Sequence, residues 1–141
     1  MQQKPSTMNI SSFDDLLQAA RQQTEPQRLL FVFANAELPQ DSTPAQREDF
    51  LAGHGGALVP VMCVDKTPAE LASFADLLEE SRQFSKDWRI VFAAALTGTV
   101  GNAPSSEAAE KPLQRMVEAI KAGTFGSYIP FDRQGLPVML G

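Results

Sequence analysis

The chain has 141 residues, of which 43% are hydrophobic and 21% charged, and its net charge at pH 7 is -5. This length fits one domain of common size, and the composition is that of a globular chain rather than a disordered one. The acidic balance argues against nucleic acid and against an anionic membrane surface, because both are bound through clustered Lys and Arg. We therefore expect neither a nucleic-acid partner nor a membrane partner.

The compartment is inferred from the cysteine count and from the beginning of the chain. Cys63 is the only cysteine, so no disulfide can form within the chain. Residues 1–7 are polar and lack the apolar core of a signal peptide, and no apolar run reaches the length of a membrane span. We expect a cytoplasmic protein with a mobile extension over residues 1–8, a possible second start at Met8, and one domain over residues 9–141.

The first elements are a helix and an apolar strand. Ser11 or Ser12 can cap the helix, with Asp14 and Asp15 in its first turn. An apolar stripe with helical spacing follows, made of Phe13, Leu16, Leu17 and Ala20. Residues 28–34 are apolar without a polar face, which predicts a central strand covered on both sides.

Two capping boxes flank a second strand. Thr43 and Gln46 form the first box, which predicts a short helix up to about Ala52. Residues 58–64 read as a strand, and Pro60 in it indicates a sheet edge, a bulge or a later start, because proline cannot donate to a ladder. The box of Thr67 and Glu70 predicts a helix whose apolar face contains Leu71, Phe74, Ala75 and Leu78.

The last third predicts a strand, a loop, a helix and a hairpin. Residues 88–96 form the third strand, and residues 97–106 are a loop rich in Gly, Asn, Pro and Ser. The helix that follows starts near Pro112, ends at Gly123, and has an apolar stripe of Leu113, Met116, Val117 and Ile120. Residues 127–131 and 136–140 flank a turn with Gly135 in the left-handed conformation, which predicts a C-terminal β-hairpin.

Strands that alternate with helices favour parallel neighbours joined by right-handed crossovers. We therefore predict a single α/β domain with a mixed, mostly parallel sheet of about five strands, helices on both faces and the C-terminal β-hairpin.

The end of the second strand is the first candidate site, because ligands of α/β sheets bind beyond the carboxyl ends of strands. Cys63, Asp65 and Lys66 lie there, and a facing Lys66 could lower the pKa of the Cys63 thiol. The alternative is that Cys63 is a small buried core residue, and no histidine lies nearby in sequence to act as its base.

His54 and Arg133 are two further candidates with simpler alternatives. His54, in a Gly-rich segment, could be catalytic or a lone metal ligand, or could belong to a plain exposed loop. Arg133 could bind a carboxylate or phosphate of a ligand, although turn chemistry alone explains its neighbours Asp132 and Gly135. With one histidine, one cysteine and no nucleotide-binding fingerprint, we expect no metal and no cofactor.

Adjacent acidic pairs are a weaker starting point for acid–base chemistry. Neighbouring residues of a helix point about 100 degrees apart, so their carboxylates do not converge. Capping explains Asp14 and Asp15, and a solvated helix face explains Glu79 and Glu80.

The C-terminal segment is dense in aromatic residues. Phe125, Tyr128 and Phe131 could pack on the last helix or could form a self-association surface, because aromatic anchors are favoured at interfaces. We predict an interface at these three residues.

A resemblance to a known family is carried by residues 9–21, 62–68, 79–84, 112–123 and 130–135, and it covers nearly everything from Met8 onward. These stretches resemble a family of short uncharacterised bacterial proteins that often carry the automatic label of a ribonucleotide reductase alpha subunit. The resemblance implies no activity and no functional residues. The chain is too short for the barrel of a reductase, and a single Cys63 cannot be both radical carrier and dithiol reductant, so we reject that activity.

Two functions are consistent with these observations. The preferred one is a non-enzymatic cytoplasmic binding or interaction protein that forms a homodimer, since no catalytic constellation converges in the sequence. The alternative is a small enzyme or ligand-binding domain that uses the strand end around Cys63, Asp65 and Lys66.

Overall fold

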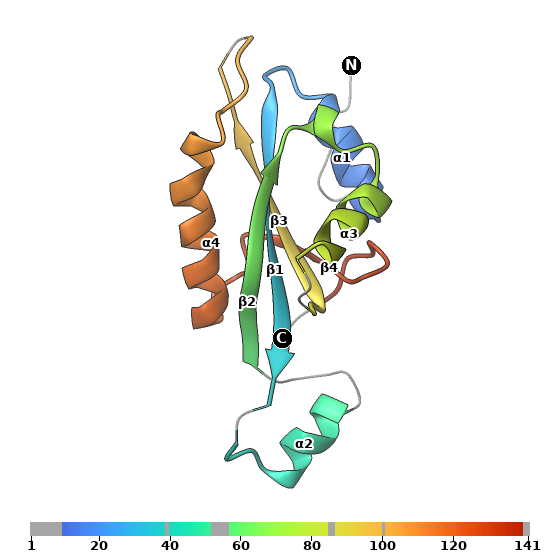
Figure 1. Cartoon of the computed structure of the whole chain (residues 1–141), viewed down its shortest axis with the longest axis vertical. Coiled ribbons are helices and arrows are strands. Elements are labelled where there is room, and N and C mark those ends of the chain that lie inside the picture. The colour runs from blue at the N-terminus through green and yellow to red at the C-terminus, as the bar shows by residue number, and fades with distance from the viewer. Residues whose placement is uncertain (1–9, 39, 52–56, 85–86, 100, 140–141) are drawn as a thin grey trace.

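In a computed structural model of the protein, a β-sheet lies between two layers of helices. The structure describes residues 10–38, 40–51, 57–84, 87–99 and 101–139. Helix α4 covers one face, helices α1 and α3 cover the other, and α2 lies beyond one end of the sheet (Figure 1). The helices are α1 Phe13–Arg21, α2 Pro44–Leu51, α3 Phe74–Arg82 and α4 Glu110–Ala122. The strands are β1 Gln27–Glu37, β2 Ala57–Lys66, β3 Ile90–Thr97 and β4 Ile129–Phe131.

The sheet is antiparallel throughout, so the predicted mostly parallel sheet of five strands is wrong. Its four strands have the order β2-β1-β3-β4, and each pair of neighbours runs antiparallel. Strands and helices do alternate along the chain, but β1 lies between the two strands that α3 connects. Strands β2 and β3 are therefore parallel to each other without being neighbours. The alternation of strands and helices is the same whether the two parallel strands are direct neighbours or have another strand between them, so it does not distinguish these two topologies.

The C-terminal hairpin is shorter than predicted. Gly135 has a φ of 79°, the left-handed conformation expected for it, and its turn reverses the chain. Among the described residues, the returning segment forms a single bridge between Phe131 and Pro137, supported by a bond from Val138 N to Pro130 O of 3.0 Å. The turn therefore closes over β4 without adding a fifth strand.

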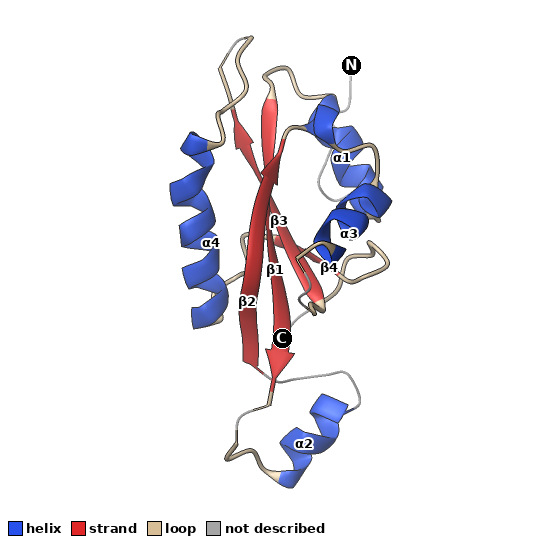
Figure 2. Cartoon of the chain, viewed as in Figure 1, coloured by secondary structure: helices blue, strands red, loops and turns tan. Residues whose placement is uncertain are grey.

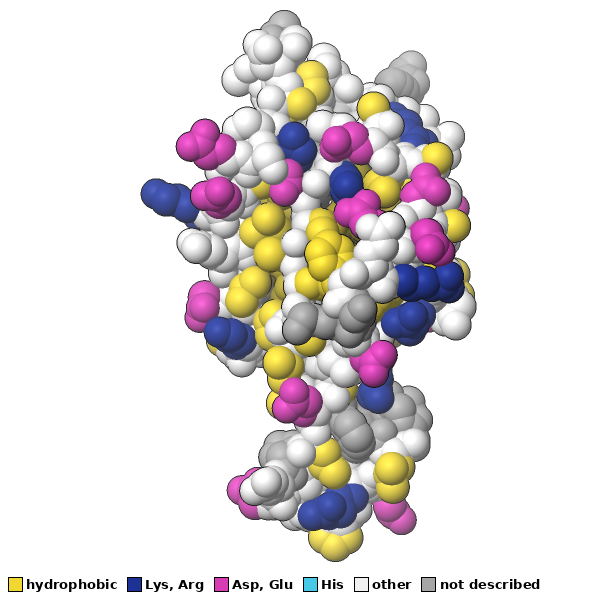
Figure 3. Space-filling view, viewed as in Figure 1, with side chains coloured by type: hydrophobic (Ala, Val, Ile, Leu, Met, Phe, Trp, Pro, Cys, Tyr) yellow, Lys and Arg dark blue, Asp and Glu magenta, His cyan; other side chains and the backbone are white. Residues whose placement is uncertain are grey.

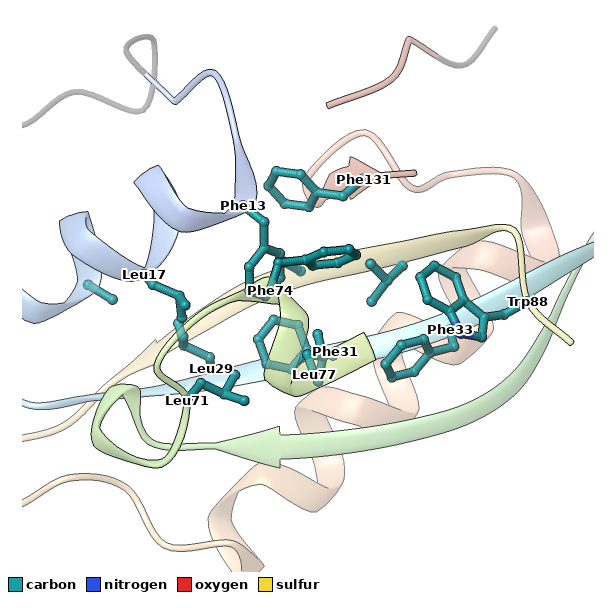
Figure 4. Close-up of a cluster of buried hydrophobic side chains, with 13 residues drawn as sticks. Phe13, Leu17, Leu29, Phe31, Phe33, Leu71, Phe74, Leu77, Trp88 and Phe131 are labelled. Carbon is teal, nitrogen blue, oxygen red and sulfur yellow. The ribbon is translucent and has the colours of Figure 1, made fainter. Parts of the chain in front are cut away.

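The core on the α1 and α3 side is built around aromatic rings. Phe13 of α1 contacts three other rings, those of Phe31, Phe74 and Phe131, at centroid distances of 5.4, 5.0 and 5.2 Å. Figure 4 shows that these rings come from two helices and two strands and point toward one another. The stripe predicted for α1 is confirmed in its main members, because Phe13, Leu17 and Ala20 are buried.

The second core lies under α4. Leu113, Met116 and Ile120 of this helix are buried against the alternate residues Leu30 and Val32 of β1. Both faces of β1 are thus covered, as predicted from the absence of a polar face in residues 28–34. Helix α4 is followed by the C-cap residue Gly123, whose φ of 78° matches its predicted role as a terminator.

Helix α3 begins later than its capping box predicted. The box of Thr67 and Glu70 opens only a 3-10 turn over Pro68–Glu70, and the α-helix starts at Phe74. Asp14 of α1 caps this start, because its Oδ1 accepts a hydrogen bond of 2.9 Å from Phe74 N. The buried side chains here are Leu71, Phe74 and Leu77, whereas Ala75 is exposed.

Candidate interaction site at the edge of β2

The three strand-end candidates do not converge on one point. Cys63 and Asp65 pair with β1 residues that face α4, whereas Lys66 pairs with Leu29, which faces α1 and α3. Successive side chains of a strand point to opposite faces, so Lys66 lies across the sheet from the other two. Its Nζ is 2.9 Å from Glu80 Oε1 on α3.

Asp65 takes part in a structural cluster. Its Oδ2 lies 3.1 Å from Arg28 NH1 and accepts a hydrogen bond of 2.7 Å from Ser106 Oγ. Arg28 also donates through Nε to Pro104 O at 2.8 Å, and its side chain is only 14% exposed. These contacts hold the loop before α4 against the sheet, which gives Asp65 a structural role.

Cys63 is exposed as a residue, but its thiol is not activated. Partial burial raises its pKa, and the negative charge of Asp65 raises it further. A higher pKa means less thiolate at neutral pH, and the thiolate is the reactive form. Cys63 therefore lacks the electropositive surroundings that a nucleophilic cysteine needs.

A groove between β2 and α4 lies beside Cys63. It has a volume of about 440 Å³ and is open to solvent. The residues that line it are Cys63 from β2 and Glu110, Leu113, Gln114, Val117 and Glu118 from α4. Glu110, Gln114 and Glu118 are spaced by four residues, so they form one row along the helix. We call them the acidic row after its two glutamates, Glu110 and Glu118.

Strand β2 forms one edge of the sheet, because β1 is its only neighbour among the described strands. Figure 2 views the molecule with β2 in front of the other strands, between α4 on one side and α1 and α3 on the other. Hydrophobic side chains gather along the middle of the same view, with charged side chains around them (Figure 3). The edge residues Val61, Met62, Cys63 and Val64 are each partly or fully exposed.

The prediction from Pro60 is confirmed in two respects. The proline lies in an edge strand, and the register shifts opposite Phe33 and Ala34, so that Val61 is an extra residue in β2. Edge strands tolerate proline because no ladder bond is lost on the open side.

The side chain of Arg133 contacts Trp88 of the same chain. Its NH1 donates to Trp88 O at 2.9 Å, and its guanidinium carbon lies 4.6 Å from the centre of the Trp88 ring. This stacking holds the C-terminal turn on the core. His54 lies outside the described residues.

The predicted aromatic interface divides into one core residue and two partly buried ones. Phe131 is 0% exposed and belongs to the α1-side core, so its side chain is not on the surface. Phe125 and Tyr128 are partly buried against the α4-side core, with Phe125 5.2 Å from the Phe92 ring.

The acidic pairs have separate partners. Ser12 Oγ accepts from Asp15 N at 3.2 Å, and the Asp15 carboxylate accepts from Ser11 N at 2.9 Å, whereas Asp14 caps α3. On α3, Glu79 contacts Arg82 and Glu80 contacts Lys66.

Sequence reasoning missed the groove. Pro60 indicated an edge strand, and the four-residue spacing of Glu110, Gln114 and Glu118 in the sequence indicated that they share one face of a helix. The placement of the edge strand beside this helix face depends on the strand order, which the sequence pattern did not fix.

Within the described ranges, no three His, Cys, Asp or Glu side chains gather as potential metal ligands. In the same part of the chain, no helix combines the length and apolar character needed to cross a bilayer. No protein-family model, curated protein or solved structure matches the chain.

Proposed function

We propose that this chain is a non-enzymatic cytoplasmic interaction protein that binds an extended segment of a partner along the free edge of β2. The observation that carries the proposal is the long apolar edge of β2, which has a neighbour on one side only among the described strands. An edge strand presents unpaired N–H and C=O groups, and an extended peptide can pair with them as an added strand.

An enzyme built on Cys63, Asp65 and Lys66 is less well supported. Asp65 is bound to Arg28 and Ser106, Lys66 lies on the other face, and the raised pKa of Cys63 keeps its thiol protonated. No observation on these residues favours a chemical step.

The predicted homodimer is one special case of strand addition, in which the added strand is β2 of a second copy. Light scattering measures the mass of the protein in solution and so distinguishes a monomer from a dimer. A dimer mass that falls to the monomer mass on Val61→Lys would identify the second copy as the occupant of the edge. Cytoplasmic location and homodimer formation both stay predictions.

The proposal is tested with a phage library of random twelve-residue peptides selected on the wild-type protein. We expect enriched peptides whose affinity drops at least tenfold for Val61→Lys, because a lysine on an edge strand opposes pairing. The matched control is Ala95→Lys, which places a lysine at an exposed position of β3. This variant should bind the selected peptides with unchanged affinity. Binding should also slow amide hydrogen exchange over residues 58–66. A library without enriched peptides, or peptides that bind Val61→Lys equally well, would refute strand addition at β2.

A further inference from the structure

We infer that the segment bound at the β2 edge is basic and apolar, with two Lys or Arg residues four positions apart and an apolar residue midway between them. This inference rests on the proposed strand addition, and it deepens that proposal by assigning the partner's chemistry.

The groove sets the position of the apolar residue. In a strand added beside β2, every second side chain points to the α4 side of the sheet. Those side chains reach the groove of about 440 Å³ that Cys63, Leu113 and Val117 line with apolar surface. An apolar side chain placed there removes both its own surface and that of the groove from water.

The acidic row sets the positions of the basic residues. Glu110 and Glu118 line the groove and are both exposed. Eight residues of α-helix at 1.5 Å each span about 12 Å. Four residues of a strand at 3.3 Å each span about 13 Å. Because α4 runs alongside β2 (Figure 1), side chains at positions i and i+4 of the added strand match the spacing of the two carboxylates.

The neighbouring cations do not neutralise this row. Glu118 Oε2 lies 3.7 Å from Lys121 Nζ, but both side chains are more than half exposed, and such pairs contribute little. Lys111 and Arg115 of α4 do not line the groove.

Charge also decides between a foreign segment and a second copy. Antiparallel pairing of β2 with its own copy keeps both α4 helices on the same side of a continuous sheet. The two acidic rows would then face each other across the symmetry axis, and like charges brought together oppose association. A basic partner replaces this repulsion with attraction.

The test compares the peptides selected on the wild-type protein with those selected on the double variant Glu110→Lys/Glu118→Lys. We expect Lys or Arg at i and i+4 around an apolar residue in the first set, and acidic residues at those positions in the second. Synthetic peptides from the first set should bind the double variant roughly tenfold more weakly, because exposed ion pairs contribute modestly. The difference should shrink at high salt. The control Glu79→Lys/Asp87→Lys changes the net charge equally at two exposed positions outside the groove and should leave binding unchanged.

The outcomes separate this inference from the proposed function. Peptides that lose affinity for Val61→Lys but carry no basic pair would refute the basic partner and leave strand addition standing. A dimer that the same substitution dissociates would also refute the basic partner. A library without edge-binding peptides would refute both.

Discussion

Phe131 provides the most direct test of the core, because it is predicted from sequence as an interface residue and lies fully buried in the structure. Its ring is 0% exposed and meets the Phe13 ring edge-on at 5.2 Å. Replacing a buried phenylalanine by alanine costs 3–5 kcal/mol, and an aromatic pair contributes about 0.5–1.5 kcal/mol beyond its buried area. We expect Phe131→Ala to lower the free energy of unfolding by about 4 kcal/mol.

Urea denaturation followed by circular dichroism measures this loss. With a denaturant slope of about 2 kcal/mol per molar urea, the midpoint should fall by about 2 M. The control is Phe125→Ala, which removes a partly buried ring with one aromatic contact and should cost roughly half as much. A loss below about 1 kcal/mol for Phe131→Ala, or a smaller oligomer at unchanged stability, would contradict the burial and restore Phe131 to an interface.

Four further predictions concern the turn, the loop, acid stability and the thiol. Gly135→Ala should cost about 1–3 kcal/mol in thermal melts, because its φ is 79° and a Cβ there would lie 3.0 Å from an aromatic ring; Gly123→Ala, where the space is open, should cost only about 1 kcal/mol. Arg28→Ala should cost about 2 kcal/mol and speed amide exchange in residues 101–106, because its hydrogen bond to Pro104 O and its ion pair with Asp65, which holds Ser106, are lost. Hydrogen bonds from Ser11 lower the pKa of the Asp15 carboxylate. Its contribution to stability is therefore present above the unfolded pKa and is lost as the pH falls through the folded pKa. Asp15→Asn should flatten the loss of stability below about pH 4. Iodoacetamide should modify Cys63 more slowly at pH 7.5 in the native protein than in urea, and the native rate should rise as pH approaches the raised pKa.

Periodicity predicted the elements of this fold well because it reports burial. The stripes of Phe13, Leu17 and Ala20 in α1 and of Leu113, Met116 and Ile120 in α4 are buried as their spacing requires. Glycine positions were equally informative, since Gly123 and Gly135 both adopt the left-handed backbone that glycine tolerates. These are local properties, which the local sequence determines.

Strand order was not predictable in the same way, because it depends on contacts between distant segments. The apolar pattern of residues 28–34 is expected for a central strand with parallel or with antiparallel neighbours, because a sheet covered by helices on both sides buries both faces of that strand in either case. The aromatic residues show the same limit. Phe131 and Phe125 are close in sequence and similar in character, but β4 pairing places Phe131 at the centre of one core and leaves Phe125 at the margin of the other.

The two edges of the sheet differ, and this difference is what makes β2 a binding site in our proposal. At β4 the C-terminal turn folds back, bridges Phe131 to Pro137 and covers a strand of only three residues. Strand β2 has ten residues and no such cover among the described segments, and its bulge and Pro60 interrupt pairing near one end. The stretch from Met62 to Lys66 remains regular and lies beside the acidic row. The bulge shortens the regular part of this apolar edge, and the charges beside it oppose non-specific aggregation, whereas a short partner strand with a matching charge spacing can still pair there.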